Sequence, residues 1–392
     1  MSMRNIAIIA HVDHGKTTLV DCLLKQSGSF RENEATSERM MDSNDLERER
    51  GITILAKATS VVWEDTRINI VDTPGHADFG GEVERILNMV DGAIVLVDAA
   101  EGPMPQTKFV VSKALKVGLR PIVCVNKIDK PESRPDEVIN EVFDLFASLD
   151  ATDEQLDFPI IYGSAKNGWM ADDYEKPTTD MAALFNLVIK HVPEPTVDDG
   201  PFRMIATTIS ADNFLGRILT GRVAAGTVKP NQQIKVLSRD GSVVEQGRVS
   251  KVLAFRGLER SPIDEGKAGD IVSIAGLTKA NVADTLCDPA VTEAMEAQPI
   301  DPPTLSMVFR VNDSPLAGTE GKKVTSRVIW DRLEKEVEGN VALKVSRSTT
   351  AESFEVSGRG ELQLAVLIET MRREGFELGI SRPRVVMQKD EA

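Results

Sequence analysis

The sequence predicts three consecutive domains: a doubly wound α/β domain with a mainly parallel sheet, a β-barrel, and a ferredoxin-like α+β domain. Three observations carry this prediction. Apolar strands alternate with helical patterns over residues 1–199, helical periodicity disappears over 200–300, and a βαββαβ order follows over 301–385. The last residues, 386–392, are expected to begin a further, missing C-terminal part.

The first domain opens with an apolar strand at 4–10, which leads through a turn into a helical pattern that begins at Lys16. Further strands are expected at 67–72, 93–98, 120–126 and 159–163, and helices at 16–25, 80–90, 105–117, 135–148 and 180–191. This alternation is typical of a parallel sheet covered by helices on both faces. Pro193 and Pro195, followed by an acidic linker, end the domain.

The second and third domains differ from the first in their periodicity. Short β-rich runs separated by Gly, Pro and Asp turns predict barrel strands at 204–209, 217–224, 232–237, 243–254 and 271–275. A proline cluster at 299–303 marks the next boundary. Beyond it, strands are expected at 304–311, 341–347, 352–357 and 376–382, and helices at 321–338 and 360–374.

Composition narrows the classes of function. The apolar runs are shorter than the roughly 20 residues that a bilayer span needs, and no secretory signal pattern precedes the first strand. The sequence therefore predicts a cytoplasmic protein without a membrane partner. The net charge of −15 argues against DNA binding or a general nucleic-acid coat, so local patches must make any contact with RNA. We expect a monomer.

A phosphate-binding loop is predicted at the end of the first strand. The segment AHVDHGKT over 10–17 follows that strand and opens a helix, which is the context such a loop requires. Backbone amides would face the phosphates, with a lysine ammonium and a threonine hydroxyl supplying a cation and a Mg²⁺ ligand. Ala10 stands where a leading glycine is usual. The predicted nucleotide contacts here are Asp13, His14, Gly15, Lys16, Thr17 and Thr18.

Two further segments complete the predicted phosphate and Mg²⁺ contacts. DTPGH over 72–76 ends a strand, so that Asp72 would reach the metal through water and Gly75 would offer its N–H to the γ-phosphate. RGIT over 50–53 closes the polar segment 31–51, and Thr53 is the candidate second hydroxyl on Mg²⁺ beside Thr17. Residues 44–50 also fit a solvated helix face. Because a segment this polar buries too little apolar surface to fold by itself, we expect the γ-phosphate and Mg²⁺ to order it.

The base of the nucleotide is predicted to meet two more post-strand segments. The carboxylate of Asp129 in NKID would accept hydrogen bonds from guanine N1–H and the exocyclic amine, a donor pair that adenine does not offer. The backbone N–H of Ala165 in SAK would meet guanine O6. Ligands gather at such carboxyl ends of strands in open α/β sheets. The predicted base contacts are Asn126, Lys127, Asp129, Ser164, Ala165 and Lys166.

His76 is the candidate catalytic residue. It is placed to orient the water that attacks the γ-phosphate, a role that Gln has in other proteins that hydrolyse GTP. The alternative is that His76 has a purely structural role in the segment that follows the strand 67–72. His11 and His14 are expected to shape the loop, and Asp13 to hold a monovalent cation beside the phosphates.

Taken together, these motifs resemble those of translational GTPases. The resemblance covers essentially the whole chain, because a barrel followed by a ferredoxin-like domain is the order found in the elongation factor G group. Only about 35 residues separate Asp129 from Ser164, which leaves no room for the large insert of elongation factor G itself. The closing runs SGRGELQL, MRREGFEL and SRPR over 357–384 look specifically like the BipA/TypA family.

The resemblance implies a GTPase that uses GTP or GDP with Mg²⁺, binds the rRNA and proteins of the ribosome, is stimulated by the ribosome, and serves stress adaptation and large ribosomal subunit assembly. It also implies binding of ppGpp in the same pocket. The family continues with further domains after Arg384, so we expect a truncated chain. Two alternatives stay open: a nucleotide-gated assembly scaffold with incidental hydrolysis, and a translocation or ribosomal-protection factor on the same core.

Overall fold

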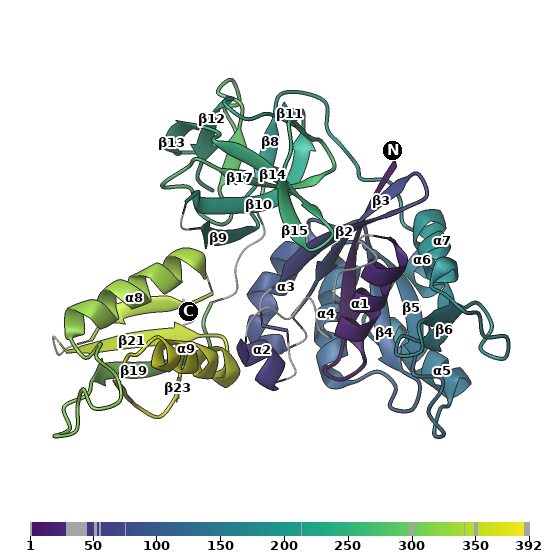
Figure 1. Cartoon of the computed structure of the whole chain (residues 1–392), viewed down its shortest axis with the longest axis horizontal. Helices are drawn as coiled ribbons and strands as arrows, with labels where there is room; N and C mark the ends of the chain where they lie inside the picture. The colour runs from purple at the N-terminus through teal and green to yellow at the C-terminus, as the bar shows by residue number, and fades with distance from the viewer. Residues whose placement is uncertain are drawn as a thin grey trace, which may run out of the picture. The chain divides into compact units, whose positions relative to one another are not determined.

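The computed structural model describes residues 2–28, 45–50, 53–54, 56–74, 76–212, 214–297, 302–340, 342–348 and 352–387. They form two compact units (Figure 1). The first unit combines residues 1–76 and 82–297, and the second combines 77–81 and 298–392. The first unit therefore contains both the predicted α/β domain and the predicted barrel. The division of the chain into three domains at residues 199 and 300 stays a prediction.

A seven-stranded sheet forms the centre of the α/β part, in the order β2-β3-β1-β4-β5-β6-β7. The five strands from β3 to β6 in this order run parallel, while β2 and β7 are antiparallel to their neighbours. The strands are β1 (Ser2–Ala10), β2 (Lys57–Trp63), β3 (Thr66–Asp72), β4 (Gly92–Asp98), β5 (Arg120–Asn126), β6 (Ile160–Ser164) and β7 (Trp169–Ala171). The predicted parallel strands are confirmed, whereas β2 and β7 were not predicted.

Helices cover both faces of this sheet, as β1 illustrates. Ile6 and Ile8 pack against α1 and α7 on one face, while Ala7 and Ile9 pack against α3, α4 and α5 on the other. Both faces are buried because parallel strands need crossover helices on each side. The helices are α1 (Lys16–Gln26), α2 (Asp45–Arg50), α3 (Gly80–Leu87), α4 (Pro105–Lys116), α5 (Pro135–Ser148), α6 (Asp153–Leu156) and α7 (Ala182–His191).

The barrel is built from antiparallel strands around one apolar core. Nine strands join in one sheet, in which β10 pairs with β8, β9 and β17, and β11 pairs separately with β16. The strands are β8 (Arg203–Ile205), β9 (Thr208–Asp212), β10 (Gly216–Ala225), β11 (Thr227–Val228), β12 (Gln233–Leu237), β13 (Val243–Arg248), β14 (Lys251–Arg256), β15 (Glu259–Pro262), β16 (Gly266–Lys267), β17 (Ile271–Ala275) and β18 (Thr285–Cys287).

Two of the predicted barrel runs are each divided in the structure. The run 204–209 becomes β8 and β9, because Ala206 and Thr207 leave the first ladder and bond to residues outside it. The run 243–254 becomes β13 and β14, because β13 pairs with β12 while β14 pairs with β15 and β17. An apolar run shows that strands are present, but it does not show where the chain changes partner strands.

Polar and apolar contacts join the barrel to the sheet within the first unit. Asn5 Nδ2 donates to Gly269 O (2.9 Å), and Arg222 forms an ion pair with Asp91 (2.8 Å). Ile271 of β17 packs among the buried side chains on one face of the sheet. Burial of both polar and apolar groups explains why the α/β part and the barrel form one unit.

The second unit has the strand order β20-β21-β19-β22, with β23 also paired to β19. Its elements are η1 (Ala77–Phe79), β19 (Leu305–Val311), α8 (Ser326–Gly339), β20 (Lys344–Arg347), β21 (Ser353–Gly358), α9 (Glu361–Arg373), β22 (Leu378–Ile380) and β23 (Arg384–Val385). The βαββαβ prediction is thus confirmed, with one correction. Helix α8 begins at Ser326 and not at Gly321, because the amides of Gly318, Glu320 and Gly321 instead bind the Glu377 carboxylate.

No helix in the described part of the chain combines the length and the apolar character that a bilayer span requires.

Candidate nucleotide-binding site

The loop between β1 and α1 contains two residues with left-handed backbone. Asp13 has φ 65° and Gly15 has φ 96°. A Cβ atom on Gly15 would lie 2.5 Å from Nδ2 of Asn126, so only glycine fits at this position. The helix N-terminus directly follows, and its first amides have no intrahelical acceptor. The loop therefore has the geometry of an anion-binding turn.

A buried charge cluster lies beside this loop. Lys16 Nζ forms an ion pair with Asp72 Oδ1 (2.9 Å) and also donates to the carbonyl oxygen of Thr73. Thr53 Oγ1 donates to Asp72 Oδ2 (3.4 Å). Lys16, Thr53 and Asp72 are all buried. A lysine from α1, a carboxylate from the end of β3 and a hydroxyl from residue 53 thus come together from separate segments.

The oxygen atoms of this cluster suit Mg²⁺. Thr53 and Asp72 present a hydroxyl and a carboxylate within hydrogen-bonding distance of each other, and the half-buried Thr17 follows Lys16. Mg²⁺ prefers oxygen ligands and usually takes one or two carboxylates together with phosphate oxygens. The donor set therefore fits the ion. Gly75, which was predicted to contact the γ-phosphate, lies outside the described residues.

Asn126 connects the phosphate loop to the predicted base-binding segments. Its Nδ2 donates to His14 O, and its Oδ1 accepts from Ala165 N, both at 2.9 Å. The side chain is buried at the end of β5. Ala165 N–H therefore has a partner inside the protein, and its predicted contact with guanine O6 requires this hydrogen bond to be shared or exchanged.

Asp129 is exposed and has no hydrogen-bond or ionic partner in the part of the chain that the structure describes. It follows β5 by three positions, in a turn that also contains Lys127, whose φ is 62°. An unpaired carboxylate at this edge of the sheet is able to accept two hydrogen bonds from a ligand. Thr18 and Lys166 are also exposed, whereas Ser164 is buried.

Sequence reasoning missed Asp98, which ends β4. Its Oδ2 lies 2.8 Å from the Nζ atoms of both Lys127 and Lys130, and Lys127 Nζ also donates to Asp13 O. Burial by itself would raise the pKa of Asp98, but the hydrogen bonds from the two lysines lower it to about 2. Asp98 thus fixes Lys127 against the predicted phosphate-binding loop. Its position at the carboxyl end of a parallel strand was the signal available in the sequence.

His14 is fully buried, and its ring contacts β4 and the residues that follow it. Nδ1 lies 3.4 Å from Leu96 O, and Nε2 lies 3.5 Å from Glu101 Oε2. Burial lowers the pKa of His14 below the usual histidine value, which favours the neutral ring. The rings of His11 and His14 pack edge to face at 5.2 Å. These contacts are those of a side chain that shapes the loop.

His76 is half-buried and follows the end of β3 by four positions. Its role in orienting water stays a prediction.

Helix α2 corrects one expectation about residues 44–50, which were expected to fit a solvated helix face. Glu47 is fully buried, accepts from Ile54 N (3.0 Å) and forms an ion pair with Lys57. Part of the predicted solvated helix face therefore points into the protein. Residues 29–44 and 51–52 lie outside the described residues.

Comparison with known families gives two matches along the chain. Residues 1–194 match the elongation factor Tu GTP binding domain, and residues 216–287 match elongation factor Tu domain 2. A protein of Salmonella typhimurium named large ribosomal subunit assembly factor BipA is 58% identical over 99% of this chain. Over nearly its whole length the chain is thus similar to BipA proteins, and its first 194 residues match a GTP-binding domain family. The BipA proteins of Buchnera aphidicola and Haemophilus influenzae are 55% and 56% identical to this chain.

The chain covers only part of these BipA relatives. It spans 64% of the length of the Salmonella protein and 63% of the Buchnera protein. Among solved structures, one from Thermus thermophilus matches with a TM-score of 0.72 and 18% identity, covering 99% of this chain and 68% of that one. At that identity the match supports the fold alone. A mixed α/β sheet, an antiparallel barrel and a ferredoxin-like unit agree with the predicted fold class.

Proposed function

We propose that this chain binds GTP with Mg²⁺ and hydrolyses it to GDP and phosphate. The observation that carries the proposal is the pair of hydrogen bonds made by Asn126. One side chain from β5 joins the loop after β1 to the segment after β6. The segments predicted to bind the phosphates and the base therefore meet at one edge of the sheet, where open α/β sheets bind ligands.

Each group at this edge has a role in the proposed complex. The amides at the N-terminus of α1 and the ammonium of Lys16 bind the phosphates. Asp129 accepts from guanine N1–H and the exocyclic amine, which selects guanine over adenine. Thr17, Thr53 and Asp72 would hold Mg²⁺, which neutralises charge on the β- and γ-phosphates when it is bound.

Hydrolysis in this proposal depends on His76, whose ring orients the attacking water. Asp13 holds a monovalent cation beside the phosphates, which partly replaces an arginine finger. Such a finger contributes about 10³ to 10⁵ in rate, so the isolated protein turns over slowly and the ribosome accelerates it.

We extend the proposal to ribosome assembly because the relatives are named large ribosomal subunit assembly factors. In this view the GTP and GDP states differ in the order of the segment that contains Thr53, and the large subunit, through its rRNA and proteins, recognises the GTP state. The location is then the cytoplasm, with the protein partly bound to ribosomes. The alarmone ppGpp would compete for the same phosphate-binding groups.

The test compares GTP turnover of the parent with that of His76→Ala, with and without ribosomes. We expect a fall of about 10² or more in the ribosome-stimulated rate, the range typical for loss of a proton-handling or water-positioning side chain, with unchanged GTP affinity. His191→Ala is the matched control, since His191 lies at the end of α7. Equal rates for the parent and His76→Ala would remove His76 from the mechanism, and a parent without turnover would overturn the hydrolysis proposal.

The same variant separates the enzyme from a nucleotide-gated scaffold. If His76→Ala hydrolyses no GTP yet supports large-subunit assembly as well as the parent does, then GTP binding is what matters and hydrolysis is incidental. Failure of assembly with intact GTP binding would favour the enzyme.

A further inference from the structure

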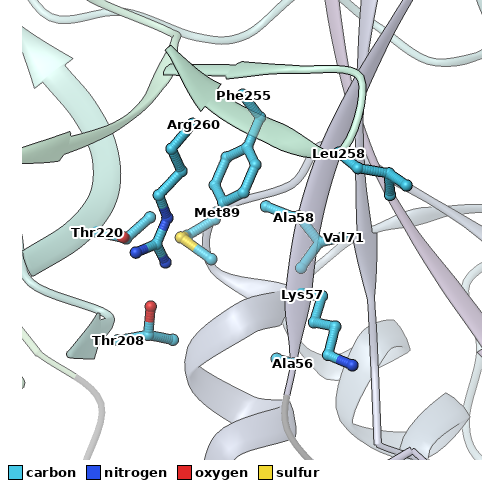
Figure 2. A pocket seen from close by; sticks show the side chains of 10 residues that line it. All are labelled: Ala56, Lys57, Ala58, Val71, Met89, Thr208, Thr220, Phe255, Leu258 and Arg260. Carbon is cyan, nitrogen blue, oxygen red and sulfur yellow. The ribbon is translucent and has the colours of Figure 1, made fainter. Parts of the chain in front are cut away.

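A cavity of about 410 Å³ opens between the barrel and the central sheet, within the first unit. On the sheet side its lining comes from the segment 56–58, β3 and Met89, and on the barrel side from β9, β10, β14, β15 and the turn between β14 and β15 (Figure 2). The volume lies within the range of about 300 to 1,000 Å³ that is typical of small-molecule sites. The cavity takes its walls from two parts of the chain and does not include the residues assigned to the nucleotide.

One side of the cavity is apolar. Val71 and Met89 are buried, and Ala58 and Phe255 are half-buried beside them. Figure 2 shows the thioether of Met89 and the ring of Phe255 close to Arg260. An aromatic ring and a flexible thioether are surfaces that accept ring or alkyl groups of varied shape.

The other side carries a cation, Arg260, that no carboxylate of the described residues neutralises. Arg260 donates to Ser210 Oγ (2.7 Å) and lies 5.2 Å from the centre of the Phe255 ring. Arg260 is exposed to solvent, and within the described residues it has no acidic partner. The second cation of the lining, Lys57, differs because it forms an ion pair with the buried Glu47. Arg260 is thus the cation in this lining that is available to an anion.

A hydroxyl group lies in reach of the same end of the cavity. Thr208 and Thr220 are cross-strand neighbours in β9 and β10. The Thr220 hydroxyl bonds to Ser273 Oγ (2.7 Å), whereas the half-buried Thr208 hydroxyl has no hydrogen-bond partner in the described part of the chain. In Figure 2 the Arg260 guanidinium points toward these two threonines. A guanidinium beside an unpaired hydroxyl is a donor pair that suits carboxylate, sulfonate or phosphate oxygens.

We propose that this cavity binds a small amphipathic anion, with its acidic group on Arg260 and Thr208 and its apolar body against Met89 and Phe255. Because the two walls belong to the sheet and the barrel, a bound anion contacts both parts. Ala58 belongs to β2, which begins four positions after the predicted Mg²⁺ ligand Thr53. A bound anion would therefore also contact this strand. The proposal does not depend on GTP hydrolysis.

The test measures binding of three probes of one shape and different charge: naphthalene-2-sulfonate, 2-naphthol and 2-naphthylmethylammonium. Each is titrated into the protein by calorimetry with GDP and Mg²⁺ present in excess, so that the nucleotide site is filled. For ligands of this size we expect the sulfonate to bind with a Kd of about 1 mM or tighter. The neutral probe should bind at least tenfold more weakly, and the cation more weakly still.

Arg260→Gln should weaken sulfonate binding about tenfold or more, because a hydrogen bond to a charged group is lost. Thr208→Val should weaken it severalfold. Arg248→Gln, an exposed arginine on β13, is the matched control and should leave the Kd unchanged. Thermal unfolding of each variant establishes that it is folded. Equal affinity for the three probes, an unchanged Kd in Arg260→Gln, or no sulfonate binding by the parent would each overturn the proposal.

Discussion

The phosphate side and the base side of the candidate site differ in how their charges are paired. On the phosphate side, Lys16 and Asp72 are buried and bonded to each other at 2.9 Å. On the base side, Asp129 is exposed and has no partner among the described residues. The first pair therefore contributes to the folded state without a ligand, whereas Asp129 gains a partner only when a ligand arrives. Substitutions on the two sides should differ in their effect on stability.

The largest effect is expected on the phosphate side, from Lys16→Ala. This variant leaves the Asp72 carboxylate buried without its cation, at a cost of about 3 to 5 kcal/mol in the free energy of unfolding. GTP affinity should fall about 100-fold or more. Urea unfolding and titration with a fluorescent GTP analogue measure the two quantities. Lys25→Ala, on the exposed side of the same helix, is the control. Unchanged stability in Lys16→Ala would refute the internal pairing.

On the base side, Asp129→Asn should change affinity but not stability. The loss of two charge-assisted hydrogen bonds should weaken GTP binding by about 2 to 4 kcal/mol and shift the preference to the xanthine nucleotide. The free energy of unfolding should change by less than about 0.5 kcal/mol, as for an exposed surface position. Competition between GTP and XTP provides the measurement, with Glu132→Gln in the same loop as the control. Retained preference for guanine would show that Asp129 does not contact the base.

The smallest effect concerns Asp98, whose partner Lys127 also bonds to Asp13 O in the loop of the phosphate side. Its pKa of about 2 lies below the unfolded value of about 3.9, so its charge stabilises the fold above that unfolded value. This contribution, about 2 kcal/mol, is lost as the pH falls from about 4 through 2. In urea unfolding at a series of pH values, the stability difference between parent and Asp98→Asn should therefore shrink across this window. A difference independent of pH would contradict the assigned ion pairs.

Much of the fold was predictable because both periodicities in this chain are strong. The strand predicted at 93–98 is observed as β4 at Gly92–Asp98, and the helix predicted at 135–148 is α5 over those same residues. Long amphipathic helices and continuous apolar strands are easy to predict from the sequence, because burial alone determines their pattern of apolar residues. The antiparallel strand β2 was missed, since an edge strand with polar residues has no such continuous apolar run.

Other errors came from side chains whose partners are distant in the sequence. The pattern of residues 44–50 also fits a solvated helix face, but Lys57 and the amide of Ile54 hold Glu47 inside the protein. Helix α8 begins later than the sequence predicts, because the Glu377 carboxylate, more than fifty positions away, binds the preceding amides. Local pattern contains no information about such partners.

The sequence by itself determined the type and order of the elements, the motifs at the carboxyl ends of the strands, and the family resemblance. These depend on local periodicity and on residue types at short spacings, which a single chain displays directly. Only the tertiary structure decided that Asn126 joins two loops, that Asp98 holds Lys127, and that Arg260 faces a cavity with no acidic partner among the described residues. Each of these depends on which distant groups meet after folding, because electrostatic and hydrogen-bond energies act through space and not along the chain.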